Sequence, residues 1–182
     1  MRPRLLDMEE TTMQYTATYS SPLGGITLAS NGEQLTGLWF DGQKYFGSTL
    51  GPQHEARDLP VFHEAARWLD LYFSGQEPSF TPPLCLQGSP FRRAVWDLLL
   101  QIPYGQRTTY GELAAKLARQ RGLDSMSAQA VGGAVGHNPI SLIVPCHRVV
   151  GSQGNLTGYA GGLQRKTQLL ALEARGTGCP IG

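Results

Sequence analysis

The sequence lacks any long apolar run. No stretch approaches the roughly 18 uninterrupted apolar residues that a membrane-spanning helix requires. The first 12 residues include Arg2, Arg4, Glu9 and Glu10 and contain no apolar segment of the kind that directs secretion. We therefore expect a cytoplasmic protein that does not interact with membranes.

Cysteine is scarce, and its spacing excludes two kinds of site. The three cysteines, Cys85, Cys146 and Cys179, are an odd number at wide spacing without a C-x-x-C pair. This argues against a disulfide framework and against a tetrahedral zinc site. The histidines show no metal-ligand spacing with one another or with Cys85. We expect no metal, no cofactor and at least one free thiol.

The net charge is small but unevenly distributed. The 182 residues are 41% apolar and 16% charged, which suits one globular domain or two small ones. Residues 1–88 carry five basic and ten acidic side chains, a net charge of −5, whereas residues 89–182 carry ten and four, a net charge of +6. A basic half suggests contact with a polyanion such as nucleic acid. The alternative is a chance excess of arginine on a solvated face.

The first half has the pattern of a small α+β unit. Short β-prone runs at 15–19, 26–29 and 35–40 are separated by turn residues. Asn31-Gly32 between two of these runs is a strong hairpin signal, because both residues tolerate a positive φ angle. Apolar residues at helical period then predict a helix over 61–74.

A proline-rich segment at 77–90 separates the two halves. It contains four of the 12 prolines, which predicts an extended connector rather than a helix or a strand. We place the domain boundary here, with domains at 1–88 and 89–182.

Three helix starts follow in the second half. Ser89-Pro90 has the residue types of an N-cap and a first turn and opens a helix over 91–101. Thr109-x-x-Glu112 is a capping box for the next helix, and Ser127 can cap a third. Three helices of this kind resemble a helix-turn-helix arrangement that binds DNA.

The third of these helices has little side-chain bulk. It contains three glycines between Ser127 and His137, although a glycine within a helix costs about 0.5–1 kcal/mol relative to alanine. Something must therefore approach its backbone closely. One explanation is tight packing against another helix. The other is a nucleic-acid groove against the small face, with Gln129 and Asn138 making the polar contacts.

The candidate nucleophile lies in the string Pro145-Cys146-His147-Arg148-Val149. The apolar run at 140–144 before it predicts a buried strand that ends near Cys146. Cationic neighbours at His147 and Arg148 would lower the pKa of the thiol and raise the thiolate fraction. The alternative is a small buried apolar side chain beside a surface imidazole.

A glycine-rich loop follows the cysteine. Residues 151–162 contain five glycines but match neither G-x-x-x-x-G-K-[ST] nor G-x-G-x-x-G, the two common phosphate-binding patterns. We expect this loop to close over a flat ligand, with Tyr159 stacking on a base or hydrogen-bonding to it. A last helix over 163–174 would bring Glu173 towards His147.

These strings together resemble the O6-alkylguanine-DNA alkyltransferase family. The resemblance rests on T-Y-G-E-L-A from Thr109, on G-x-N-P-I-S-L-I-V-P-C-H-R-V up to Val149, and on G-Y-A-G-G-L-x-R-K followed by Glu173. In the first half, S-P-L-G and L-T-G-L-W-F resemble the family's more variable domain. The resemblance implies an α/β (α+β) fold, with an N-terminal ribonuclease-H-like domain and a C-terminal winged-helix-like (helix-turn-helix) DNA-binding domain.

The resemblance also implies repair of double-stranded DNA that contains O6-alkylguanine. The alkyl group would pass directly and irreversibly to Cys146, so that each molecule acts once; O4-alkylthymine is a second candidate substrate. His147 would take the thiol proton through a water, and Glu173 would orient His147. Tyr110 would neutralise the departing guanine, and Asn138 would brace the active-site turn. The protein would act as a monomer, with cooperative binding along DNA left open.

A base inside a duplex cannot present its O6 alkyl group to a buried thiol, so the resemblance implies base flipping. The glycine-rich helix would enter the minor groove, and a side chain from it would fill the vacated stack. The familiar residue at that place is an arginine, whereas this sequence has Gln129. Ala160 stands where some relatives have a serine that reaches guanine O6. The implied DNA and substrate contacts are Ala128, Gln129, Arg148, Ser152, Tyr159 and Ala160.

Two other kinds of function fit parts of the pattern. A non-catalytic relative would bind alkylated bases without accepting the group, but such proteins lack the reactive cysteine. A cysteine hydrolase or a winged-helix regulator would share only the architecture. The hydrolase needs an oxyanion hole, and the regulator needs a dimer with base-reading side chains in the major groove.

Overall fold

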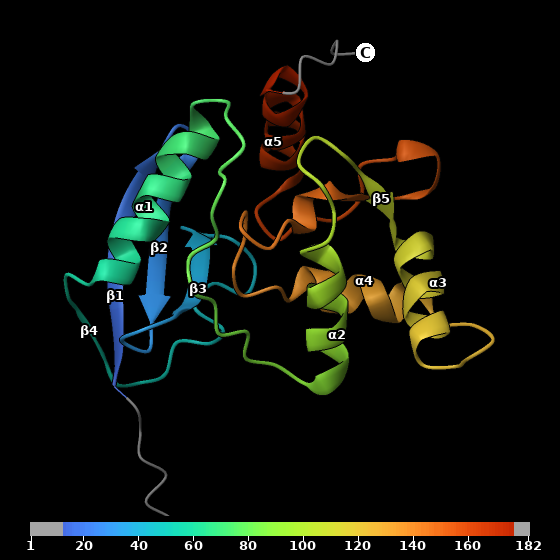
Figure 1. The fold of residues 1–182 in the computed structure, drawn as a ribbon, viewed down its shortest axis with the longest axis horizontal. Coiled ribbons are helices and arrows are strands. Elements are labelled where there is room, and N and C mark those ends of the chain that lie inside the picture. Colours follow the sequence, from blue (N-terminus) through green and yellow to red (C-terminus); the bar gives the residue numbers. More distant parts are fainter. Residues whose placement is uncertain (1–12, 177–182) are drawn as a thin grey trace, which may run out of the picture.

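The N-terminal half is a four-stranded sheet covered by one helix. A computed structural model describes residues 13–176 (Figure 1). The elements of this half are β1 (Gln14–Ser21), β2 (Gly24–Ser30), β3 (Leu35–Phe40), β4 (His54–Ala56) and α1 (Pro60–Phe73). The strand order is β3-β2-β1-β4, and α1 lies along one face of the sheet. The three predicted strands and the helix are confirmed; β4, which pairs parallel with β1, was not expected.

The turn between β2 and β3 forms as its residue types predict. The Asn31 side-chain oxygen accepts a hydrogen bond from the backbone N–H of Gln34 at 2.8 Å. Gly32 has a φ angle of 112°, a conformation that glycine adopts without steric cost. The two strands that it joins are antiparallel, which confirms the predicted hairpin.

The C-terminal half is mainly helical. Its elements are α2 (Pro90–Leu99), β5 (Thr108–Thr109), α3 (Tyr110–Gln120), α4 (Ala128–Gly136), a 3-10 turn η1 (Cys146–Arg148), β6 (Val149–Val150), a second 3-10 turn η2 (Ser152–Gly154) and α5 (Leu163–Gly176). The side chains of Ser89, Thr109 and Ser127 each accept a backbone N–H from the residue three positions later, and Thr109 forms the full capping box with Glu112. All three predicted helix starts are therefore confirmed.

The predicted strand over 140–144 is wrong. Only Ile140 makes a strand-like bridge, to Leu38 of β3, and the chain then turns. The Asn138 side chain closes this turn, because it accepts a hydrogen bond from the Ile140 N–H at 3.0 Å and donates one to the Val144 carbonyl at 2.8 Å. Leu142 has a φ angle of 71°, which no strand residue adopts. The apolar character of the run reflects complete burial rather than strand pairing.

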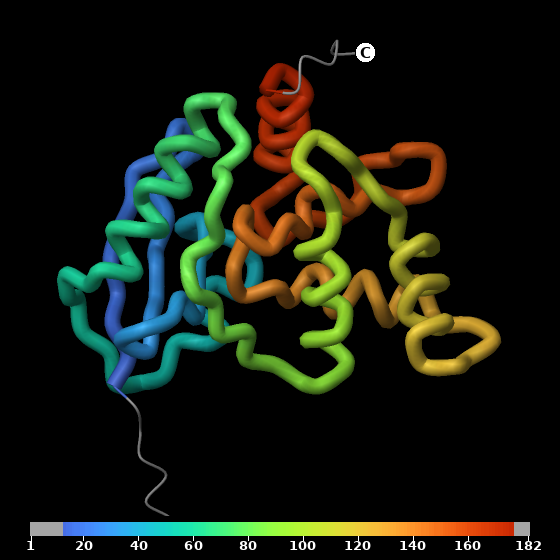
Figure 2. The backbone as a smooth tube through the Cα atoms, in the orientation of Figure 1, coloured from blue at the N-terminus to red at the C-terminus, as the bar shows by residue number. Residues whose placement is uncertain are grey.

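The outer edge of β3 joins the two halves. The proline-rich connector pairs with it through hydrogen bonds from Leu35 N to Pro83 O at 2.7 Å and from Cys85 N to Leu35 O at 2.9 Å. Figure 2 shows the connector running between the sheet and the C-terminal half. Further along the same edge, Leu38 N donates to Pro139 O at 2.9 Å. Because an unpaired strand edge is costly to leave open, these contacts fix the turn before Cys146 against the sheet.

Some expectations concern residues at the two ends of the chain. The expectations for Met1–Thr12 and for Cys179 lie outside the described residues. Within residues 13–176, Cys85 and Cys146 are free thiols, and no group of three or more His, Cys, Asp or Glu side chains could hold a metal ion. None of the helices in that part of the chain is long and apolar enough to cross a bilayer.

Candidate active site

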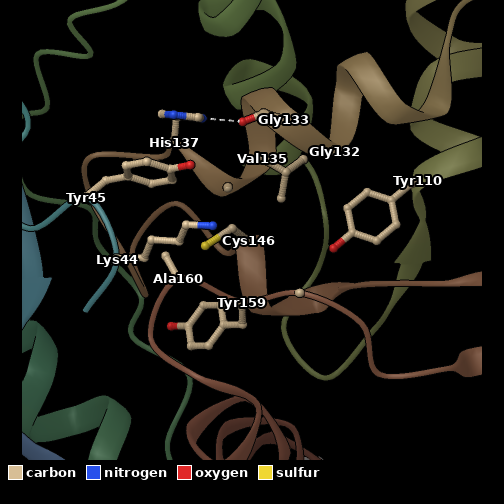
Figure 3. A pocket seen from close by; sticks show the side chains of 12 residues that line it. Lys44, Tyr45, Tyr110, Gly132, Gly133, Val135, His137, Cys146, Tyr159 and Ala160 are labelled. Carbon is tan, nitrogen blue, oxygen red and sulfur yellow. Dashed lines mark hydrogen bonds between the residues drawn. The ribbon is translucent and has the colours of Figure 1, made fainter. Parts of the chain in front are cut away.

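Cys146 lies at the floor of a pocket between the two halves of the chain. The pocket has a volume of about 320 Å³, within the usual range for small-ligand sites. Figure 3 shows the cysteine sulfur facing the space between α4, the loop at 158–160 and Tyr110. The thiol residue is only 5% exposed. A ligand must therefore enter the pocket to reach it.

The glycines of α4 form one side of this pocket. Gly132, Gly133 and Gly136 all line it. A Cβ atom added at Gly133 or Gly136 would meet no atom within 4 Å, and one at Gly132 would make only ordinary contact with the Tyr110 ring at 3.6 Å. Tight packing against another helix therefore does not account for these glycines. Their small size keeps the pocket open, which favours the alternative of a ligand against the helix.

A buried hydrogen-bond network lies behind the cysteine and centres on Glu173 of α5. The Glu173 carboxylate contacts His147 Nε2 through a short hydrogen bond and accepts a hydrogen bond from the Tyr72 hydroxyl at 2.7 Å. Its other oxygen accepts from Arg148 Nε at 2.7 Å and from Gly105 N at 3.0 Å. The predicted approach of Glu173 to His147 is confirmed.

The orientation of His147 follows from this network. Because Nε2 faces the Glu173 carboxylate, it carries the ring proton when the imidazole is neutral. Nδ1 is buried and has no hydrogen-bond partner within the part of the chain that the structure describes. That nitrogen is therefore available as an acceptor, so the imidazole can take a proton from a donor that reaches it.

The pKa values in this network follow from burial and from the interactions of Glu173 with His147 and Arg148. Burial by itself raises the pKa of Glu173, but the hydrogen bond to His147 and the charges of His147 and Arg148 outweigh it and lower that pKa to about 2. Burial lowers the pKa of His147, and Glu173 opposes this effect only in part. The resting pair is thus a carboxylate beside a neutral imidazole.

The expectation that His147 and Arg148 lower the pKa of Cys146 is wrong. Burial raises that pKa, and a hydrogen bond with Asn138 and the charge of Lys166 offset the increase only partly. His147 and Arg148 direct their polar atoms to Glu173 instead. Cys146 therefore rests as a thiol and requires a base to become a nucleophile.

Arg148 is directed into the interior rather than towards the surface, which gives no support to the expectation that it contacts DNA. Its side chain is 9% exposed, and it donates to Glu173 and, at 2.7 Å, to the Ile102 carbonyl. The reason is that Glu173, 25 residues later, needs a buried cation to remain ionised. Arg148 stabilises the network rather than a phosphate.

Lys166 is a second buried cation, and the motif analysis gave it no role. It is 0% exposed, and its Nζ donates to the carbonyls of Val149, Thr157 and Gly158. These bonds tie the glycine-rich loop to the strand that follows Cys146. Lys166 therefore shapes the pocket wall, and its charge is one of the influences that favour the thiolate.

The other predicted site residues divide between the pocket and the exposed surface. Tyr110, Tyr159 and Ala160 line the pocket (Figure 3), and the Tyr110 hydroxyl donates to Thr157 O at 3.1 Å. Burial raises the pKa of Tyr110, which keeps it a proton donor. Ala128 and Gln129 are exposed at the start of α4, and Ser152 is exposed in η2. Asn138 closes the turn before Cys146, as described above.

Two pocket residues come from the N-terminal half, where no motif had indicated a site. Lys44 and Tyr45 follow β3 and line the pocket, with the Tyr45 ring beside His137 at the C-terminal end of α4 (Figure 3). They reach it because β3 docks on the turn that precedes Cys146. Neither a charge cluster nor a glycine pattern marks them in the sequence.

Comparison of the chain with known proteins identifies its family. The model described as "6-O-methylguanine DNA methyltransferase, ribonuclease-like domain" matches residues 14–86. The model described as "6-O-methylguanine DNA methyltransferase, DNA binding domain" matches residues 90–175. The chain belongs to the 6-O-methylguanine DNA methyltransferase family. The expected fold, a ribonuclease-like sheet domain followed by a helical DNA-binding domain, is confirmed.

Individual members of the 6-O-methylguanine DNA methyltransferase family are similar to this chain over most of their length. The methylated-DNA–protein-cysteine methyltransferase of Mycolicibacterium paratuberculosis is 46% identical over 158 residues, which are 87% of this chain and 91% of that protein. The one of Haemophilus influenzae is 40% identical over 163 residues, 89% of this chain and 87% of that protein. The crystal structure of Mycobacterium tuberculosis OGT in complex with DNA matches with a TM-score of 0.75 and 42% identity, covering 93% of this chain and 96% of that one.

Proposed function

We propose that this chain repairs double-stranded DNA by moving an alkyl group from O6 of guanine to the sulfur of Cys146. The observation that carries the proposal is a thiol at the floor of an open pocket with a His147–Glu173 pair behind it. Curated relatives are named for methyl transfer from DNA to a protein cysteine, which supports the same reaction here. The reaction needs no metal or other cofactor.

The proposed mechanism begins with proton removal. His147 Nδ1 accepts the thiol proton through a bridging water, and Glu173 stabilises the imidazolium that forms. The thiolate attacks the alkyl carbon from the side opposite O6, so that an S–C bond forms as the C–O bond breaks. The electron pair stays on guanine O6, and Tyr110 donates a hydrogen bond or its proton to the ring. Because a thioether is not hydrolysed, each molecule reacts once.

Access to the thiol requires an extruded nucleotide. Flipping costs a few kcal/mol because stacking and pairing are lost. We propose that α4 enters the minor groove and that Gln129, exposed in its first turn, fills the vacated stack with Ala128 beside it. Ser152 in η2 would contact the backbone, while Tyr159 and the Ala160 segment would enclose the flipped base.

A single chain supplies every group of the proposed site, which supports action as a monomer. Cys85 and Cys146 are free thiols, and the reaction needs Cys146 reduced. This supports a reducing compartment, for which we propose the cytoplasm.

The intact mass of the protein tests this function. After incubation with duplex DNA that contains O6-methylguanine, each molecule should gain one methyl group, and peptide mapping should place it on Cys146. Undamaged duplex of the same sequence should add nothing. A product that exceeds one equivalent of protein would indicate hydrolysis with turnover and contradict the proposal, as would an unmodified protein.

We predict that Gln129→Ala slows reaction with duplex DNA about tenfold but leaves reaction with free O6-benzylguanine unchanged, because only the duplex has a stack to fill. Single-turnover rates with both substrates measure the difference. Gln168→Ala on the exposed face of α5 is the matched control and should affect neither rate. Equal losses on both substrates would remove Gln129 from this role.

A further inference from the structure

The segment at 44–46 reaches from the N-terminal domain to the rim of the pocket. Lys44 and Tyr45 line the pocket together with α4 and Cys146 (Figure 3). The Lys44 backbone N–H donates to Ala160 O at 2.9 Å. The Tyr45 ring stacks on the ring of His137, with 3.9 Å between centroids and 23° between planes. The segment thus bridges the two walls of the pocket.

This segment is held in place from the side of the sheet. The Gln43 side chain is buried and accepts a hydrogen bond from Phe40 N at 2.8 Å, and Phe46 packs against Trp39 with ring centroids 5.8 Å apart. Tyr45 has a φ angle of 60°, which is unfavourable for an aromatic residue and persists only where the surroundings enforce it. The Tyr45 ring is therefore preorganised at the rim.

The chemistry of the segment suits a nucleotide. Tyr45 is 41% exposed, although its ring already stacks on one neighbour. The Lys44 ammonium lies 5.3 Å from the centre of the Tyr45 ring. A flipped nucleotide brings a flat base and a phosphate to the same opening, and an ammonium beside an aromatic ring matches both. The domain that carries Lys44 is otherwise acidic, with a net charge of −5 over residues 1–88, so this cation is not part of a general basic surface.

We propose that the N-terminal domain completes the substrate site, with Lys44 pairing to a backbone phosphate of the extruded nucleotide and Tyr45 forming a wall against its base. The His137 ring stacks on Tyr45. The His137 ring is itself held by a contact between its Nδ1 and Gly133 O at 2.7 Å. This inference rests on the alkyl transfer proposed above. The wild-type reaction tests that transfer separately, so the two can fail independently.

Lys44→Gln tests the phosphate contact. Removing one phosphate contact should reduce the slope of log K against log salt by about one and weaken duplex binding severalfold at low salt. Arg67→Gln, which removes a cation on α1 that lies over the Phe80 ring, is the control and should leave the slope unchanged. An unchanged slope for Lys44→Gln would overturn the phosphate assignment.

Tyr45→Gly tests the wall. Glycine removes the ring and suits the positive φ angle, so the variant should fold at least as well as the original. Its rate should fall about tenfold with duplex and also with free O6-benzylguanine, since both present the same base. Tyr45→Phe keeps the ring and should stay within about twofold of the original rate. Equal rates for Tyr45→Gly and the original protein would overturn the wall assignment.

Discussion

Cys146→Ser is expected to abolish methyl transfer while binding to alkylated duplex stays within about twofold. The substitution keeps a small side chain at the floor of the pocket, but a hydroxyl is far less acidic and less nucleophilic than a thiol. Burial already raises the pKa of Cys146, so the reaction depends on a group that His147 can deprotonate. The intact mass should show no methyl gain after prolonged incubation.

Cys85→Ser is the control for this experiment. Cys85 is a free thiol in the connector, outside the pocket, so its replacement should leave the methyl gain complete. A methyl group on the Cys146→Ser protein would identify another acceptor and contradict the mechanism. If the wild type and both variants bound alkylated DNA but none of them gained a methyl group, the chain would be a binding protein rather than a methyl acceptor.

Glu173→Gln is expected to reduce both stability and rate. The amide is almost the same size but leaves Arg148 buried without a carboxylate and removes the charge that stabilises protonated His147. Breaking a buried ion pair from one side costs about 3–5 kcal/mol of unfolding free energy. Loss of the base's partner should slow alkyl transfer about 100-fold or more. Denaturant unfolding and single-turnover kinetics, at a temperature where the variant is folded, measure the two effects separately.

The pH dependence of stability provides a second readout for Glu173. Its pKa is about 2 in the folded protein against an ordinary value of 4.5, so the stabilisation is fully present above pH 4.5 and is lost as the pH falls towards 2. Glu173→Gln should lose this component of the acid dependence. Glu64→Gln on the exposed face of α1 should retain it. An unaltered acid profile for Glu173→Gln would contradict the assigned network.

Features that depend on neighbours in sequence were predictable. Ser89, Thr109 and Ser127 each cap a helix through a bond to a residue three positions away, and such bonds need no tertiary information. The Asn31-Gly32 hairpin is local for the same reason. The strands β1 to β3 and the helices α1 to α5 therefore followed from residue types and spacing, whereas β4 did not.

Features that depend on distant partners were not predictable in this way. The run at 140–144 has strand-like composition, but the Asn138 clamp and the docking of β3 convert it into a turn. Arg148 was predicted to contact DNA, whereas in the structure it donates to Glu173, which is distant in sequence. Lys44 and Tyr45 carried no motif at all, because only the contact between the domains brings them to the pocket.

The Tyr72 hydroxyl makes the two halves chemically interdependent. Tyr72 belongs to α1, is 0% exposed, and supplies one of the hydrogen bonds that keep Glu173 ionised. A chimera with an unrelated first half would therefore keep Cys146, His147 and Glu173. Its Glu173 carboxylate would lack the hydrogen bond that Tyr72 donates. Any such transplant must bring a donor to that spot, which limits how freely the first half can diverge or be exchanged.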